Sequence, residues 1–115
     1  MLQIIGTNKC RSTQKAIRWC KERKIEFQYI DLNEKKLSKK EYESIFSSCS
    51  ADEYIDSESS YYKKNGYSWR EFNPQEEVIE HPELLRTPIL RNKTKAHSGF
   101  DEDFIKEASK WDIVF

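Results

Sequence analysis

The chain has 115 residues, 35% of them charged and 37% hydrophobic, and its 20 basic residues balance its 20 acidic ones. This length fits one domain, residues 1–115, because domains typically run to about 100–150 residues. The balanced charge argues against the broad positive surface of a nucleic-acid-binding protein, and no apolar run approaches the roughly 20 residues that span a bilayer, so we expect neither direct nucleic-acid binding nor a membrane segment.

The N-terminal residues and the cysteines together indicate the cellular compartment of the protein. The sequence opens directly into a short apolar run, without the basic and long apolar regions of a signal peptide, so we expect a cytoplasmic protein. In that reducing compartment three cysteines indicate free thiols rather than a disulfide framework. The cysteines and the two histidines lack the short paired spacings of zinc sites, and we expect no metal.

The first predicted elements are a strand over residues 2–5 and a helix that begins at Cys10, after a Gly-Thr-Asn turn. The first turn of a helix leaves backbone N–H groups without partners and carries partial positive charge, which favours the thiolate form of a cysteine. Residues 9–24 contain seven basic side chains and one acidic side chain, which adds a positive field. The pattern indicates a reactive thiol at Cys10; the alternative is an inert cysteine on a solvated basic helix.

A second strand is predicted at residues 25–32, where Phe27 and Tyr29 alternate with polar residues. Strand, helix and strand in this length form a βαβ unit, whose strands pair in parallel through a right-handed crossover. Cys20 lies ten residues beyond Cys10 on the connecting helix. At about 1.5 Å rise per residue the two are roughly 15 Å apart, beyond the Cα separation of about 4.4–6.8 Å that a disulfide needs.

Residues 33–83 predict a helical insert, because four pairs place a capping residue three positions before a glutamate. Asn65 and Gly66 close a further helical segment, and Pro82 ends the last one. Cys49 shares a helical face with Tyr42 and Ile45, so we expect it in the core. The four capping pairs are Ser38/Glu41, Ser50/Glu53, Ser68/Glu71 and Asn73/Glu76.

The chain then returns to strands at residues 87–91 and 95–100, joined by a turn at 92–94, which predicts a β-hairpin. Asp101 caps a last helix with an apolar face, and residues 112–115 form a short apolar tail. The residues on that face are Phe104, Ile105, Ala108 and Trp111. The predicted order is therefore βαβ, helices, ββα.

This order resembles the thioredoxin-like fold of the arsenate reductase family, which also contains the Spx-type regulators. The resemblance covers nearly the whole chain and rests on residues 6–10, 15–19, 81–90 and 98–101. It implies an α/β protein with a mixed four-stranded sheet and a helical insert at 33–83. It also implies that Cys10 is the redox-active cysteine, and that a cis bond between Thr87 and Pro88 holds backbone beside the thiol.

Departures from the family pattern exclude some of the reactions that members of this family catalyse. Thr13 stands where a C-x-x-C pair would place its second cysteine, so dithiol chemistry is absent, and Ala16 replaces the arginine of phosphatase-like reductases. Glutaredoxin-coupled arsenate reductases use an arginine at the position of Gln14 and another at that of Thr87, whereas Arg86 here lies one residue earlier. Because oxyanions are bound by several fixed guanidinium groups, these changes argue against arsenate as the substrate.

The resemblance implies a glutaredoxin-like thiol reductase that uses Cys10 as its single nucleophile and binds no cofactor. Glutathione is the expected co-substrate, with glutathione or a glutaredoxin as partner. The implied site residues are Lys9, Arg11, Ser12, Thr13, Arg86, Thr87 and Pro88 around the catalytic Cys10. The alternative is a non-catalytic regulator that, like Spx, binds RNA polymerase. Both hypotheses stay open at this point, as do the acceptor and a resolving role for Cys49.

Overall fold

The computed structural model describes residues 2–92 and 95–113, with side chains as far as Ala108. At its centre is a four-stranded sheet in the order β2-β1-β3-β4, which confirms the predicted mixed sheet. β1 pairs in parallel with β2 and antiparallel with β3, and β3 pairs antiparallel with β4. The strands are β1 Leu2–Gly6, β2 Phe27–Asp31, β3 Ile89–Asn92 and β4 Lys95–Ser98.

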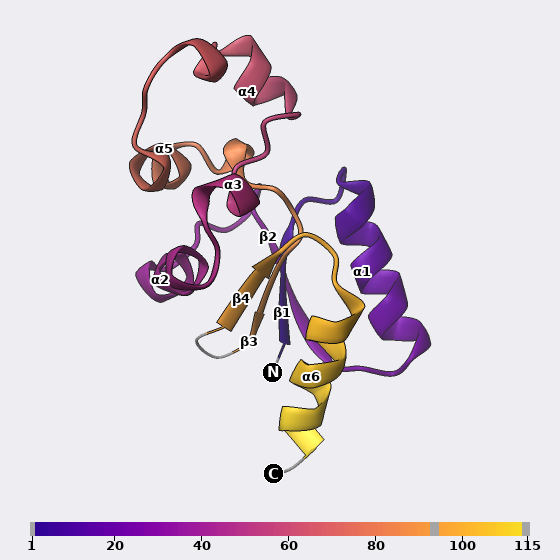
Figure 1. Ribbon diagram of the computed structural model, residues 1–115. Coiled ribbons are helices and arrows are strands. Elements are labelled where there is room, and N and C mark those ends of the chain that lie inside the picture. The colour runs from indigo at the N-terminus through magenta and orange to yellow at the C-terminus, as the bar shows by residue number, and fades with distance from the viewer. Residues whose placement is uncertain (1, 93–94, 114–115) are drawn as a thin grey trace.

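Helices cover both faces of the sheet (Figure 1). α1 (Arg11–Glu22) and α6 (Glu102–Ile113) lie on one face, and α2 (Lys39–Ser48) lies on the other. Alternate strand residues point to opposite faces, so Ile4 packs with α1 and α6 while its neighbour Ile5 packs with the insert. The sheet therefore separates two apolar clusters of buried residues. None of the helices within the described ranges is long and apolar enough to cross a membrane.

The insert occupies the chain between β2 and β3 and extends beyond one end of the sheet, while α6 extends beyond the other (Figure 1), so the molecule is elongated, 46 Å long against 25 and 24 Å. Aromatic rings join its segments to one another, and its apolar residues continue the cluster on the α2 face. After α2 it consists of α3 (Ala51–Tyr54), α4 (Ser60–Lys64), the 3-10 helix η1 (Tyr67–Trp69), α5 (Pro74–Glu80) and the 3-10 helix η2 (Pro82–Leu84).

Three of the four predicted capping pairs begin helices, at Ser38, Ser50 and Asn73. The prediction at Ser68 and Glu71 is wrong. There the chain forms the 3-10 helix η1 after the left-handed Gly66, and Tyr67, one residue before the expected cap, is buried. Burying that ring fixes the local backbone more strongly than a capping pair does, because tertiary packing overrides local propensity.

The last helix also differs from its prediction, because α6 continues to Ile113 where a tail was expected from residue 112. Its buried face includes Ile105 and Ala108, as the spacing predicts. The predicted turn residues 93–94, the side chain of Trp111 and the tail residues 114–115 lie outside the described residues. The first hairpin strand, predicted at 87–91, runs from Ile89 to Asn92, and the second, predicted to reach residue 100, ends at Ser98.

The cap of α2 offers a direct test of the local structure. The Ser38 hydroxyl accepts the Glu41 N–H over 3.3 Å, and the Glu41 carboxylate accepts the Ser38 N–H over 3.0 Å. Ser38→Ala should therefore lower the free energy of unfolding by about 1 kcal/mol, measured by urea denaturation. Ser47→Ala, at an exposed position of the same helix, should change it by less than about 0.5 kcal/mol. Equal losses in the two variants would contradict the cap.

Candidate functional site

Cys10 occupies the N-cap of α1, where the chain leaves β1. Its N–H donates to the Thr7 carbonyl over 3.2 Å, and its carbonyl accepts the Gln14 N–H over 3.1 Å, the first bond of the helix. Among the described residues its side chain forms no capping hydrogen bond. The half-buried sulfur is thus left at the helix start, beside the N–H groups of the first turn.

A loop from the other end of the chain reaches this sulfur. The Thr87–Pro88 bond is cis, as the resemblance implied, and the Pro88 carbonyl accepts the Gly99 N–H over 2.8 Å. The Thr87 hydroxyl donates to the Cys10 sulfur over 3.0 Å, and the thiol in turn donates to the Thr87 carbonyl over 3.6 Å. The structure therefore brings Cys10, Thr87 and Pro88 together, as the resemblance implied.

The surroundings of Cys10 lower the pKa of its thiol. Burial alone raises the pKa of this thiol, but stabilisation of the thiolate by the side chains of Thr13 and Thr87 and by the backbone N–H groups of Thr13 and Ser12 outweighs it. All of these groups donate to the thiolate and stabilise it relative to the thiol. The positive side chains of Lys9 and Arg11, expected from the sequence to share in this effect, are not among its causes.

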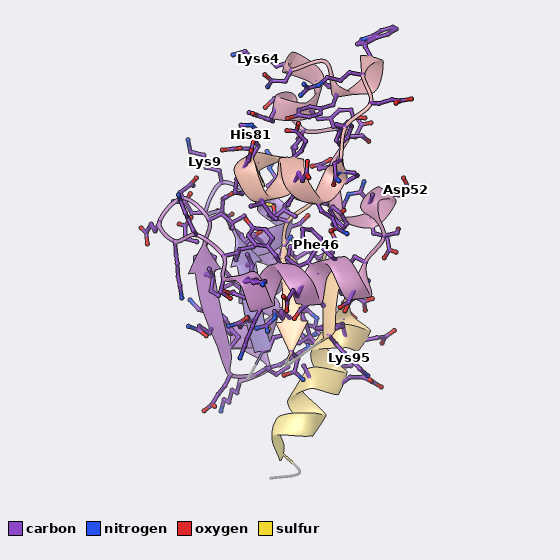
Figure 2. The ribbon with its side chains drawn as sticks, turned by 90° about the vertical axis from the view of Figure 1, so that its left-hand side faces the viewer. Lys9, Phe46, Asp52, Lys64, His81 and Lys95 are labelled. Carbon is purple, nitrogen blue, oxygen red and sulfur yellow. The ribbon has the colours of Figure 1, made fainter. Side chains whose placement is uncertain are left out.

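The three basic residues of the predicted site lie in different surroundings. Lys9 and Arg11 are exposed on either side of Cys10, and Figure 2 shows Lys9 on the outside of the molecule. Arg86 is half-buried and is bound to the insert by two hydrogen bonds. Its guanidinium donates to the Ile55 carbonyl over 3.3 Å, and its backbone N–H donates to the Tyr54 carbonyl over 2.8 Å. It anchors the Thr87 loop, whereas Lys9 and Arg11 are open to solvent.

The other two cysteines are buried in different clusters. Cys20 faces the α1–α6 cluster, and burial raises its pKa to about 11. α1 carries both Cys10 and Cys20, so the distance argument from the sequence stands. Cys49 lies in the core as predicted, where its thiol donates to the Ala96 carbonyl over 3.6 Å and burial raises its pKa. Of the three thiols, Cys10 alone combines partial exposure with a lowered pKa.

Two residues that act on the groups of the site were not among the site residues predicted from the sequence. Gly6, at the end of β1, leaves room for Thr13, since a Cβ atom there would overlap the Thr13 side chain. Tyr29 of β2 has its pKa raised by burial and also by the charges of Asp31, Glu34 and Cys10. Gly6 could have been noticed as a glycine directly after an apolar strand, whereas Tyr29 followed ordinary strand alternation.

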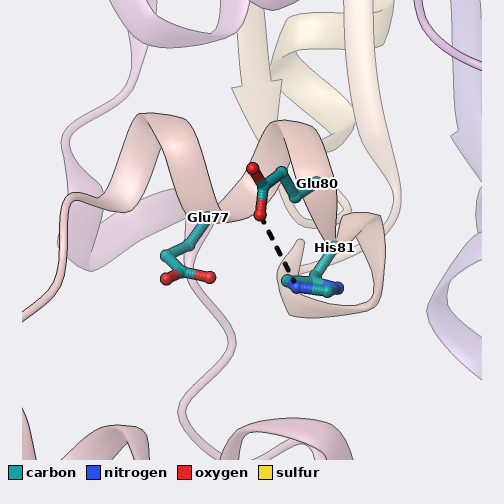
Figure 3. Close-up of side chains that lie close together, drawn as sticks. All are labelled: Glu77, Glu80 and His81. Carbon is teal, nitrogen blue, oxygen red and sulfur yellow. Dashed lines mark ion pairs between the residues drawn. The ribbon is translucent and has the colours of Figure 1, made fainter.

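A second group of ionisable side chains lies on the insert, where Glu77, Glu80 and His81 bring ligand atoms within 4.8 Å of one another (Figure 3). Its bonds already have a structural role. Glu77 accepts a hydrogen bond from the Tyr67 hydroxyl over 3.1 Å, and the His81 ring packs 5.4 Å from that of Tyr61. Glu80 is 75% exposed and lies 4.0 Å from His81. We assign this group to the packing of the insert.

The fold and the site together define a class of protein. The chain has a thioredoxin-like fold with one thiol at its site. Three features define it: a mixed β2-β1-β3-β4 sheet, a thiol at the start of the first helix, and a cis-proline loop against the sulfur of that thiol. The model of the ArsC family matches residues 5–108. The chain belongs to the ArsC family.

Relatives and solved structures agree with this assignment. The chain is 30% identical to the global transcriptional regulator Spx 2 of Oceanobacillus iheyensis over 92% of its length and 82% of that protein. It is 29% identical to Spx of Enterococcus faecalis over 98% and 89%. The arsenate reductase of Vibrio cholerae shares its fold with a TM-score of 0.74 at 18% identity, covering 93% of this chain and 96% of the other. An arsenate reductase related protein from Brucella melitensis has a TM-score of 0.69 at 16% identity, covering 92% of each.

Proposed function

We propose that this protein is a thiol reductase that uses Cys10 as its single nucleophile and glutathione as its reductant. The observation that carries the proposal is the set of donors around the sulfur. Thr87 donates over 3.0 Å, and the first turn of α1 supplies further N–H groups. They favour the thiolate, which is the nucleophilic form. The chemistry requires reduced thiols, so the proposal places the protein in the cytoplasm.

The reaction has two exchanges. The Cys10 thiolate attacks the glutathione sulfur of a mixed disulfide between glutathione and a substrate thiol, a new S–S bond forms, and the substrate sulfur leaves with the electron pair and takes a proton from water. A glutathione thiolate from solution then attacks the glutathione sulfur on Cys10, glutathione disulfide leaves, and Cys10 returns as thiolate. The substrate sulfur is reduced to a thiol, and the two electrons come from the two glutathione units that leave as glutathione disulfide, one from the substrate and one from solution.

Charge at the rim of the site fits glutathione, which carries two carboxylates. Lys9 and Arg11 flank Cys10 and are exposed, so they are free to meet those carboxylates. Arsenate fits less well, because Gln14 and Thr87 occupy the places of two oxyanion-binding arginines, and the guanidinium of Arg86 is engaged by the Ile55 carbonyl. Disulfides are therefore the proposed substrate class.

Turnover of bis(2-hydroxyethyl) disulfide with glutathione tests the proposal. Lys9→Glu combined with Arg11→Glu should raise the KM for glutathione about 3- to 10-fold, since exposed charge pairs contribute about 0.2–1 kcal/mol each. The KM for cysteamine, a thiol without carboxylates, should not rise. Arg18→Glu combined with Lys21→Glu changes the same charge elsewhere on α1 and should leave both KM values unchanged. A wild-type protein without glutathione-dependent turnover would refute the proposed activity.

The second candidate function is that of a regulator which binds RNA polymerase without catalysing a reaction. The observation that favours it is the 30% identity to a protein named as a global transcriptional regulator, over most of both chains. Binding of purified RNA polymerase, measured by surface plasmon resonance, tests it. Micromolar or tighter binding together with absent disulfide turnover would make the regulator the better assignment.

A further inference from the structure

The Thr13 side chain is in an unusual state for a buried polar group. It is fully buried, yet its hydroxyl has no hydrogen-bond partner within residues 2–92 and 95–113. Buried hydroxyls almost always have a partner, because an unpaired one loses its bonds to water and gains nothing in exchange. The folded protein therefore keeps one donor unused beside its reactive sulfur.

The position of Thr13 ties that donor to Cys10. Thr13 is the third residue of α1, one turn beyond the N-cap sulfur, and its side chain is among the groups that lower the pKa of Cys10. The Thr13 side chain packs against the backbone of Gly6. A Cβ atom at Gly6 would overlap the Thr13 hydroxyl and methyl groups, so any larger residue there would push the hydroxyl away.

The protonation state of the Cys10 sulfur determines whether it can accept a hydrogen bond from this donor. In the thiol form the sulfur accepts from the Thr87 hydroxyl over 3.0 Å and donates to the Thr87 carbonyl over 3.6 Å. A thiol sulfur is a weak acceptor, and one donor suffices for it. A thiolate has lost its proton, carries a full negative charge and accepts several strong hydrogen bonds. The second hydroxyl then gains a partner.

We propose that the Thr13 hydroxyl is a donor held for the Cys10 thiolate and makes Cys10 the departing sulfur when its mixed disulfide is attacked. The inference rests on the proposed function and assigns the residue that drives its second exchange. An external thiolate attacks the partner sulfur of the mixed disulfide, the S–S bond to Cys10 breaks, and Cys10 leaves with the electron pair. Sulfurs of lower pKa leave faster, and Thr13 gives the departing thiolate its hydrogen bond.

The identity of residue 13 also determines which thiol resolves the intermediate. A cysteine there would attack Cys10 from the same turn of the helix, whereas threonine stabilises the leaving sulfur and performs no attack. Cys20 and Cys49 are buried in separate clusters. The resolving thiol therefore comes from outside the chain, and Thr13 acts as a positioning residue for that step.

The test compares Thr13→Val, which keeps the shape and removes the hydroxyl, with Thr13→Ser, which keeps the hydroxyl. Iodoacetamide alkylation of Cys10 across pH reports its titration without any substrate. Release of glutathione from glutathionylated Cys10 by cysteamine, followed by mass spectrometry, reports the leaving step. In the valine variant the alkylation midpoint should rise by about one pH unit, with release several-fold slower, as expected from the loss of a hydrogen bond to a charged group. Serine should restore both values. Ser47→Ala, which removes an exposed hydroxyl of α2 away from the site, should change neither.

The outcomes separate this inference from the proposed function. An unchanged midpoint in Thr13→Val, or an equal rise in Thr13→Ser, overturns the role of the hydroxyl even if the wild type reduces disulfides. A raised midpoint and slower release in the valine variant support that role even if the wild type shows no turnover with glutathione. Gly6→Ala should reproduce the effect of valine, because it displaces the Thr13 side chain. If Gly6→Ala folds and titrates like the wild type, Thr13 is not the relevant donor.

Discussion

Replacing Cys10 by serine is expected to abolish glutathione-dependent disulfide reduction, with a loss of about 10³-fold or more. A serine hydroxyl is not ionised near neutral pH, and it forms no S–S bond with the substrate, so both exchanges lose their nucleophile. The rest of the site should be intact, since serine has nearly the shape of cysteine and can accept the Thr87 hydrogen bond. Turnover of bis(2-hydroxyethyl) disulfide measures the loss.

The other two cysteines supply matched controls for this variant. Cys20→Ser and Cys49→Ser should retain the turnover of the wild type wherever they fold, because both thiols are buried away from the site and burial raises their pKa. Alkylation of the native protein should modify Cys10 first, with a midpoint below the ordinary thiol value, because donors lower its pKa. Turnover that survives in Cys10→Ser but disappears in Cys49→Ser would move the nucleophile to Cys49.

Local sequence patterns were sufficient to predict the frame of this site. A strand over residues 2–5 and a helix start at Cys10 follow from apolar spacing and turn residues; in the structure the strand extends to Gly6, and Cys10 is the N-cap of a helix that begins at Arg11. The cis geometry of Thr87–Pro88 came from the resemblance, because composition does not determine it. The contact between the two elements joins residues 77 positions apart in the chain. No local pattern contains that information.

The details that tune the thiol depend on tertiary contacts and were not predictable in the same way. The sequence places Arg86 two residues before Pro88, but the packing of the insert directs its guanidinium to the Ile55 carbonyl. It places Thr13 one turn from Cys10, but only the β1–α1 packing shows that its hydroxyl is buried without a partner among the described residues. Charge counting favoured Lys9 and Arg11 as the cause of the lowered pKa, whereas close hydrogen-bond donors are the cause.

The insert has its own structural centre in Tyr67, which is 2% exposed. Its ring lies 4.9 Å from that of Phe72 and 5.6 Å from that of Tyr62, and the Arg70 guanidinium stacks 4.2 Å above it. Its hydroxyl donates to the Glu77 carboxylate over 3.1 Å. One side chain therefore joins α4, the segment after η1 and α5, and the cavity left by its removal would lie among all three.

Tyr67→Ala should lower the free energy of unfolding by about 3–5 kcal/mol, the usual cost of removing a buried aromatic ring. Tyr67→Phe keeps the ring contacts and loses one hydrogen bond, so about 1 kcal/mol is expected. Trp69→Ala removes a larger ring two residues away. Because Trp69 is 91% exposed, its loss should change stability by less than about 0.5 kcal/mol. Urea denaturation at pH 7 measures all three, and equal losses in Trp69→Ala and Tyr67→Ala would contradict the packing of the insert.

The pH dependence of the same variants separates the hydroxyl from the ring. Burial, followed by the hydrogen bond to Glu77, raises the pKa of Tyr67 to about 12, from an ordinary value of 10.0. The folded state thus holds the phenol proton that the unfolded chain releases at lower pH. The stabilisation from this hydroxyl is complete below pH 10 and is lost as the pH rises towards 12. The stability advantage of the wild type over Tyr67→Phe should therefore shrink between pH 10 and 12, and an advantage that stays constant over this range would show that the folded state does not retain the Tyr67 proton.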